Sequence, residues 1–200
     1  MVETAQIPPD VSYDLDASQV ARYIIALDSE RPEPDVTQLK LQKLLYLVQA
    51  NYLAATGRRL FAEPVEAFDH GPVVYSVFKR YQRYRRQVIA PDSTDWEPKL
   101  LPRDARAFID AVWDRYRGWT ASALWQLTHE QDPWAESYAK DAFRKQIPDE
   151  AMRDFFRMSV PVEERVLHPD VVVVNRELLD ELDADEEAIV ARAVSALSST

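Results

Sequence analysis

The fold of this chain is decided by the stretch LKLQKLLYLVQANYL, which occupies residues 39–53. Its apolar residues recur every three or four positions, as on one face of an α-helix. They are Leu41, Leu44, Leu45, Val48 and Tyr52, and Leu39, Tyr46, Leu47 and Leu53 widen the apolar surface. A helix that is apolar around so much of its circumference is packed by neighbours on several sides, so we expect it at the centre of the domain. Gly57 is well placed to end it as a left-handed residue.

Apolar stripes at helical spacing predict six more helices around this one. The first follows Asp16, an N-cap with Gln19 three residues later, and the arginine–proline segment near Pro32 ends it. Residues 61–69 are expected to be a short connection. The remaining predicted starts are Gly71–Pro72, Ala105, Thr120, Asp132–Pro133 and Pro148. The predicted fold class is all-α, a compact single domain of about seven helices.

Charge and proline content divide the chain into three parts. Residues 1–13 carry Pro8-Pro9 and no periodicity, and they are interpreted as a flexible lead-in; residues 14–160 are the helical domain. Residues 161–200 form an acidic C-terminal extension, because ten Asp or Glu and three Arg give them −7 of the chain's net charge of −10. Within it, residues 171–174 are predicted to be extended, and Asp183 with Glu186 to cap a final helix. We expect that helix to dock on the body or on a partner.

Composition excludes several classes of function. The chain has no cysteine, an acidic N-terminus and no apolar run approaching the ~20 residues that span a bilayer, so we expect a cytoplasmic protein without membrane contact. Its three glycines stand apart and cannot form a phosphate-binding loop. The three histidines show no metal-binding spacing, and no serine stands in a nucleophile elbow. We therefore expect no enzyme activity, no cofactor and no metal site.

Basic residues are predicted to line one face of the third helix. Lys79, Arg80, Arg83 and Arg86 alternate there with tyrosines. The stripe has three interpretations: a solvated face that pairs with the acidic tail, a docking surface for an acidic partner, or a clasp for nucleic-acid phosphates. The acidic balance of the whole molecule argues against nucleic-acid binding. Trp96 lies in a proline-rich loop and is predicted to be an exposed interface anchor.

A series of short motifs resembles the Panacea family, whose members include SocA-like antitoxins of bacteria and phages. The leading motif is Leu39–Tyr46, which contains Leu41, Leu44, Leu45 and Tyr46. Further matches follow in order: Tyr52-Leu53, Gly57, Leu60-Phe61, Glu63, Glu66-Ala67, His70-Gly71-Pro72-Val73-Val74, Leu127-Thr128-His129, Asp132-Pro133-Trp134, Ile147–Glu150 and Phe155-Phe156. One such motif would be weak evidence for the family, but several motifs in the same order make the resemblance specific. The resemblance covers residues 16–158, and the acidic tail lies outside it.

The resemblance implies a binding function. Members of the Panacea family are antitoxins that neutralise a cognate protein toxin by direct contact, in toxin–antitoxin systems that include phage defence. One branch of the family instead delivers its toxin to the ClpXP protease. Apolar motif residues are expected in the core, while Gly71-Pro72 and Asp132-Pro133 are expected to start helices. Hydrophobic burial does not account for Gln42, Lys43 and His70. They belong either to a partner surface or to an internal hydrogen-bond network, and self-association stays open.

Overall fold

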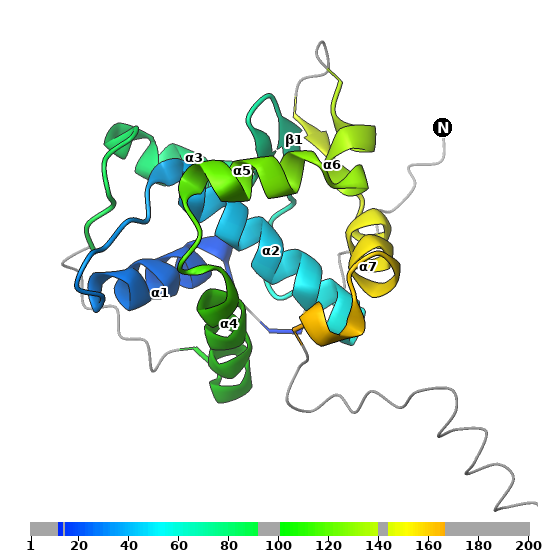
Figure 1. Cartoon of the computed structure of the whole chain (residues 1–200), viewed down its shortest axis with the longest axis horizontal. Helices are drawn as coiled ribbons and strands as arrows, with labels where there is room; N and C mark the ends of the chain where they lie inside the picture. The colour runs from blue at the N-terminus through cyan, green and yellow to red at the C-terminus, as the bar shows by residue number, and fades with distance from the viewer. Residues whose placement is uncertain (1–11, 14, 92–100, 140–143, 167–200) are drawn as a thin grey trace, which may run out of the picture. The chain divides into compact units, whose positions relative to one another are not determined.

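The long helix α2, Gln38–Thr56, lies at the centre of the computed structural model, with the other helices arranged around it (Figure 1). The structure describes residues 12–13, 15–91, 101–139 and 144–166. The other α-helices in these ranges are α1 (Ala17–Ser29), α3 (Tyr75–Tyr81), α4 (Arg103–Tyr116), α5 (Ala121–His129), α6 (Asp132–Ser137) and α7 (Asp149–Met158). Two short 3-10 helices, η1 (Gln82–Tyr84) and η3 (Val162–Glu164), follow α3 and α7. The prediction of a mostly helical domain is confirmed.

Local capping signals set the ends of the first two helices. Asp16 accepts a hydrogen bond from the Gln19 amide at 2.8 Å, and the Gln19 side chain accepts one from the Asp16 amide at 2.9 Å. This reciprocal pair is the predicted capping box. Thr37 caps α2, and Gly57 ends it with a φ of 74°. The predictions of Asp16 as an N-cap and of Gly57 as a helix end are confirmed, because each depends on a few adjacent residues, whereas the Thr37 cap was not predicted.

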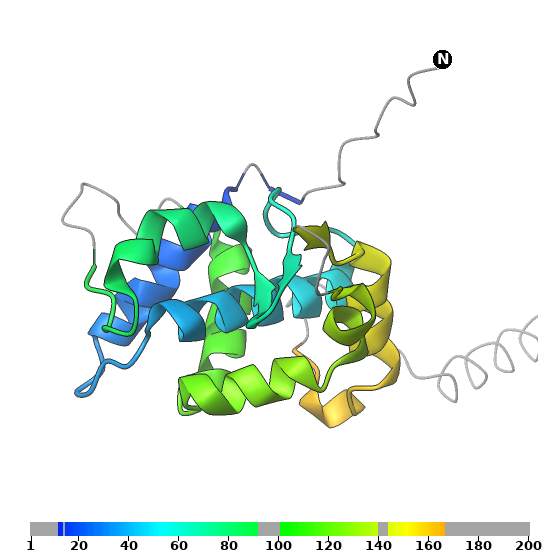
Figure 2. The same ribbon diagram turned by 90° about the horizontal axis from the view of Figure 1, so that it is seen from above.

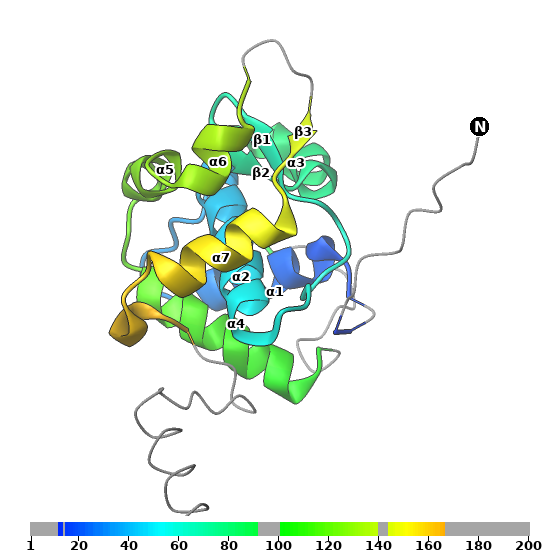
Figure 3. The same ribbon diagram turned by 90° about the vertical axis from the view of Figure 1, so that its right-hand side faces the viewer.

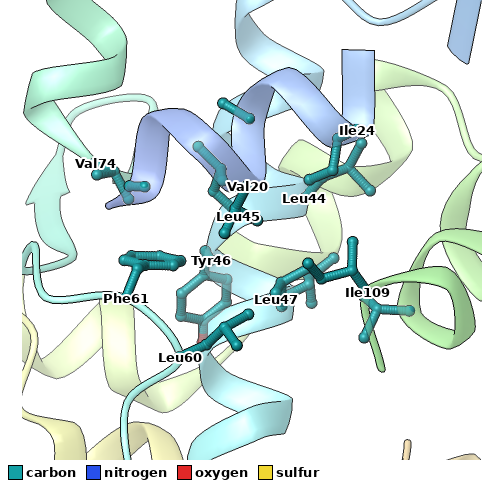
Figure 4. Packing of buried hydrophobic residues seen from close by; sticks show 14 of the residues in the cluster. Val20, Ile24, Leu44, Leu45, Tyr46, Leu47, Leu60, Phe61, Val74 and Ile109 are labelled. Atoms are coloured by element: carbon teal, nitrogen blue, oxygen red, sulfur yellow. The ribbon is translucent and has the colours of Figure 1, made fainter. Parts of the chain in front are cut away.

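The apolar residues of α2 form the middle of one hydrophobic core. Leu44, Leu45 and Leu47 are at most 1% exposed. Figure 4 shows Val20 and Ile24 of α1 beside the helix, with further core residues from the segment after α2, from α3's N-cap and from α4. Burying one such side chain contributes roughly 1.5–3 kcal/mol. In Figure 3, α7 crosses the C-terminal half of α2 and covers it from the other side.

A small antiparallel sheet replaces the predicted start of the third helix. Its strands are β1 (Glu66–Phe68), β2 (Gly71–Val73) and β3 (Lys145–Gln146), in the order β2-β1-β3. The prediction that Gly71–Pro72 begins a helix is wrong, because Gly71 has a φ of 93°, outside the helical region. Pro72 pairs with Ala67 on an edge strand, where a missing amide is tolerated.

Two smaller corrections concern helix boundaries. Helix α6 begins at Asp132 with Gln131 as its N-cap, so Asp132 is its first residue and not its cap, with Pro133 still in the first turn. Helix α3 starts at Tyr75 and ends at Tyr81, so Arg83 lies in η1 and Arg86 lies after it. The predicted basic helix face is therefore split between a helix and the turn that follows. No helix in the described ranges is both long enough and apolar enough to cross a membrane.

Candidate partner-binding groove

A groove with a volume of about 760 Å³ opens beside the N-terminal half of α2. One wall comes from α2 itself through Gln38, Leu39, Gln42 and Lys43. The others come from β2, from α3 and the residues after η1, and from the start of α5. These segments are far apart in sequence, and Figure 2 shows α2 passing between α3 and α5. We call this site the α2–α5 groove.

The side chains that line the α2–α5 groove carry positive charge only. Arg85 and Arg86 contribute cations, Lys43 contributes an amine and His70 an imidazole, and no aspartate or glutamate is among the described lining residues. Helix α5 also begins in the groove, since Thr120, its N-cap, and the next two residues line it. The partial positive charge of that helix end adds to the field. The groove therefore favours a negatively charged occupant.

Lys43 lies at the base of the groove under the β1–β2 turn. Its side chain is fully buried, and its ammonium donates hydrogen bonds to the carbonyl oxygens of His70 and Pro72, at 2.5 and 3.0 Å. Gly71 lies so close that a Cβ added there would be 2.5 Å from the Lys43 nitrogen. Burial lowers the pKa of Lys43 from 10.5 to about 7. The lysine thus fixes the turn and can change its charge near neutral pH.

Two glutamines on the same face of α2 each form a hydrogen bond with only one of their two polar side-chain atoms. The Gln38 amide nitrogen donates to the carbonyl of Phe78 at 2.9 Å, and the Gln42 amide oxygen accepts from the Val74 amide at 2.8 Å. The remaining atoms, Gln38 Oε1 and Gln42 Nε2, are buried and have no partner within the described residues. An unsatisfied buried polar group costs about 1–3 kcal/mol. Two such atoms lie four residues apart on this wall of the groove.

Lys40 belongs to a separate network behind the groove. Its fully buried ammonium donates to both carboxylate oxygens of Asp35, at 2.7 and 2.9 Å, and to the carbonyl of Arg117 at 2.8 Å. Burial raises the pKa of Asp35, but hydrogen bonds from Lys40 and Arg31 outweigh it, so the pKa lies below 3.8. This network ties the start of α2 to the end of α4.

An aromatic row extends from the groove along α5 and α6. The His129 ring lies between the rings of Trp125 and Trp134, with centroids 4.0 and 4.1 Å away, and Trp134 stacks on Tyr138. Trp134 donates to the carbonyl of Phe68 at 3.0 Å, which fastens the row to β1. Burial lowers the pKa of His129 below 6.5, which favours the neutral ring. Trp125 remains 38% exposed and forms an apolar wall of the groove.

The structure brings together four of the predicted partner-binding residues. Gln42, Lys43, His70 and Arg86 all line the α2–α5 groove. Gln42 and Lys43 form internal hydrogen bonds, which is one of the two interpretations that the sequence left open; a partner surface stays a prediction for them. Three residues of the basic stripe are exposed but do not line the groove: Lys79, Arg80 and Arg83.

Other predicted features lie outside the described residues. These are Trp96, the lead-in apart from residues 12 and 13, and the tail from residue 167 onward. Gln38, Arg85 and Trp125 are among the groove residues that sequence reasoning missed. The signal for Gln38 was a polar residue in the first turn of an otherwise apolar helix. Within the described ranges, no group of three or more metal-ligating side chains comes together.

The fold and groove define a helical domain whose mostly apolar central helix presents polar side chains at its N-terminal half to a basic groove. The family described as the antitoxin SocA-like, Panacea domain matches residues 41–135 of this chain. The match runs from within α2 to within α6 and includes most of the groove, so the resemblance seen in the sequence is confirmed over this range. No curated protein and no solved structure matches the chain.

Proposed function

We propose that this protein is an antitoxin that neutralises a cognate protein toxin by binding it directly. The observation that carries the proposal is the match to the SocA-like Panacea antitoxin family across the segment that builds the groove. The geometry supports it, because the groove joins exposed apolar surface at Trp125 to cations on its rim, the combination found at binding hot spots.

A second mode within this function is delivery of the toxin to the ClpXP protease. Both modes begin with the same complex and differ in what happens to the toxin afterwards.

The alternative from another class of function is nucleic-acid binding through the basic stripe. One observation favours it: Lys79, Arg80, Arg83 and Arg86 are all exposed, and the Arg83 guanidinium lies 5.1 Å from the ring centroid of Tyr84. Such cation–aromatic surfaces can bind phosphates and bases.

The test is co-expression with the protein encoded by the adjacent gene. Inducing that neighbour alone should arrest growth, and adding this chain should restore growth and yield a complex that co-purifies. Toxin abundance, followed by immunoblot with and without active ClpXP, separates the modes: constant abundance indicates inhibition, and protease-dependent loss indicates delivery. A toxic neighbour that forms no complex and is not rescued would refute the proposal.

The nucleic-acid alternative has its own measurement. Affinity for duplex DNA and for single-stranded RNA is measured at several salt concentrations. A steep decrease in affinity with salt that disappears on charge reversal of Lys79 and Arg80 would favour this alternative. The antitoxin proposal expects no binding at physiological salt.

A further inference from the structure

We propose that the α2–α5 groove receives an acidic peptide segment of the toxin, with carboxylates at Arg85 and Arg86 and a backbone peptide unit against Gln38 and Gln42. This inference rests on the proposed function and specifies the surface of this chain and the chemistry of the partner segment.

Charge is the first argument. Arg85 and Arg86 lie on the groove's rim and are exposed, and neither forms an ion pair with a described residue. The N-terminus of α5 places further positive charge inside, Lys43 adds to it while it is protonated, and no described lining residue carries a negative charge. Complementary charge across an interface steers association and rejects partners of the wrong sign. A segment rich in aspartate or glutamate meets this requirement.

The unpaired amide atoms of α2 are the second argument, independent of charge. The Phe78 carbonyl can only accept, so it binds the Gln38 nitrogen, and the Val74 amide can only donate, so it binds the Gln42 oxygen. These two partners therefore determine which amide atom of each side chain is the oxygen and which is the nitrogen. What remains is one acceptor, Gln38 Oε1, and one donor, Gln42 Nε2, on adjacent turns of the same helix face.

One acceptor beside one donor is the complement of a backbone peptide unit. A peptide offers an N–H and a C=O at every residue except proline. A small adjustment of the two glutamine side chains would let an inserted backbone satisfy both atoms, whereas a carboxylate alone would satisfy only the donor. Gln38 is 7% exposed and Gln42 is 2% exposed, and the two unpaired atoms are themselves buried, so the inserted backbone reaches them only through that adjustment.

The apolar part of the groove gives the segment a place for its other side chains. Trp125 forms one wall, and Leu39 and Phe78 are only partly buried on the facing sides. An extended peptide directs alternate side chains to opposite sides. Acidic residues toward the rim and apolar residues toward Trp125 would therefore satisfy both kinds of surface.

The first experiment measures complex formation with the charge-reversal variant R85E/R86E in the full chain. A matched control, R103E/K145E, reverses two exposed charges at sites that do not line the groove, on α4 and β3. We expect R85E/R86E to weaken the Kd for the toxin by roughly tenfold or more, mainly through slower association. The control should bind as the wild type does, and both should keep its melting temperature. Equal binding by both variants would overturn the inference and leave the antitoxin function intact.

The second experiment identifies what occupies the groove. The photoreactive residue p-benzoylphenylalanine replaces Ala121, which lines the groove, or Ala107 on α4 as a control. Irradiation of the purified complex should cross-link the toxin at position 121 only, and mass spectrometry should place the link in an acidic segment. A link to a basic segment, to co-purifying nucleic acid or to no toxin peptide would refute the inference.

A charge-swap experiment closes the test. Changing the acidic residues of the cross-linked segment to lysine should abolish binding to the wild type and restore it to R85E/R86E. Failure of that restoration would contradict direct pairing. If the wild type itself neither rescues growth nor forms a complex, the proposed function fails and this inference fails with it.

Discussion

Helix α2 carries three buried glutamines, and its two ends use them differently. At the α7 end, Gln49 accepts from the amides of Leu60 and Phe61 and donates to the carbonyl of Phe61, so both its amide atoms are satisfied. At the groove end, Gln38 and Gln42 each make one hydrogen bond and leave one atom without a partner. The difference separates a polar side chain whose two amide atoms are both satisfied within the fold from a pair that each keep one unpaired atom among the described residues.

The largest expected effect concerns the turn over the groove end. Gly71→Ala places a methyl group 2.5 Å from the Lys43 nitrogen and 2.8 Å from the His129 ring, at a positive φ. Backbone strain and overpacking should each cost about 1–3 kcal/mol, so we expect about 4 kcal/mol less stability in urea unfolding. Gly118→Ala is the control, because its Cβ meets nothing within 4 Å. Equal stability of the two variants would show that the turn does not rest on Lys43.

The second effect compares the glutamines directly. Gln49→Leu leaves two amides and one carbonyl of the segment after α2 unsatisfied, so the free energy of unfolding should decrease by about 3 kcal/mol. Gln38→Leu removes one hydrogen bond to the Phe78 carbonyl and also removes an oxygen that was already unsatisfied. It should therefore lower the free energy of unfolding by about 1 kcal/mol or less. Thermal and urea unfolding of both variants measure the contrast. A larger loss for Gln38→Leu would reverse the distinction between the two ends.

The third effect concerns the ion pair behind the groove. Asp35→Ala leaves the buried Lys40 ammonium with only the Arg117 carbonyl, so we expect a loss of about 2 kcal/mol, below the value for a fully buried pair because Asp35 is 43% exposed. Lys40→Met leaves Asp35 with Arg31 and solvent, and should cost about half as much. Urea unfolding at neutral pH provides both values. The opposite order would mean that the carboxylate, and not the ammonium, is the group that depends on its partner.

The fold was predictable where the signal is local. The apolar periodicity of α2, the Asp16 capping box and the left-handed Gly57 each depend on a few neighbouring residues. The hairpin of β1 and β2 was not predictable from the sequence, since Gly-Pro is also a normal helix start. Its actual conformation depends on Lys43 and His129, which approach Gly71 from two different helices.

The groove was predictable only in part. Gln42, Lys43 and His70 could be predicted as candidates because each is a polar residue in a motif whose other members are expected to stabilise the fold. Arg85 and Trp125 gave no such signal, because their place in the groove depends on how η1 and α5 pack beside α2. The sequence also could not show that Gln38 and Gln42 would each keep one unpaired atom. That property follows from the positions of the Phe78 carbonyl and the Val74 amide.

The smallest effect is a pH dependence that belongs to the groove end alone. The folded protein holds Lys43 at a pKa of about 7, while the unfolded chain holds it near 10.5, so between these values the unfolded state binds more protons. Stability should therefore rise with pH above 7, by up to about 1.4 kcal/mol per pH unit. The measurement is confined to pH 7–9, below the range in which the buried tyrosines lose protons on unfolding and reverse the slope. His129 titrates below this window, because burial lowers its pKa.

Urea unfolding of the wild type should show the rise in stability with pH, and Lys43→Met should abolish that rise even though it frees the carbonyls of His70 and Pro72. A pH dependence of stability that persists in Lys43→Met would show that another group titrates between pH 7 and 9 and that Lys43 does not change its charge there.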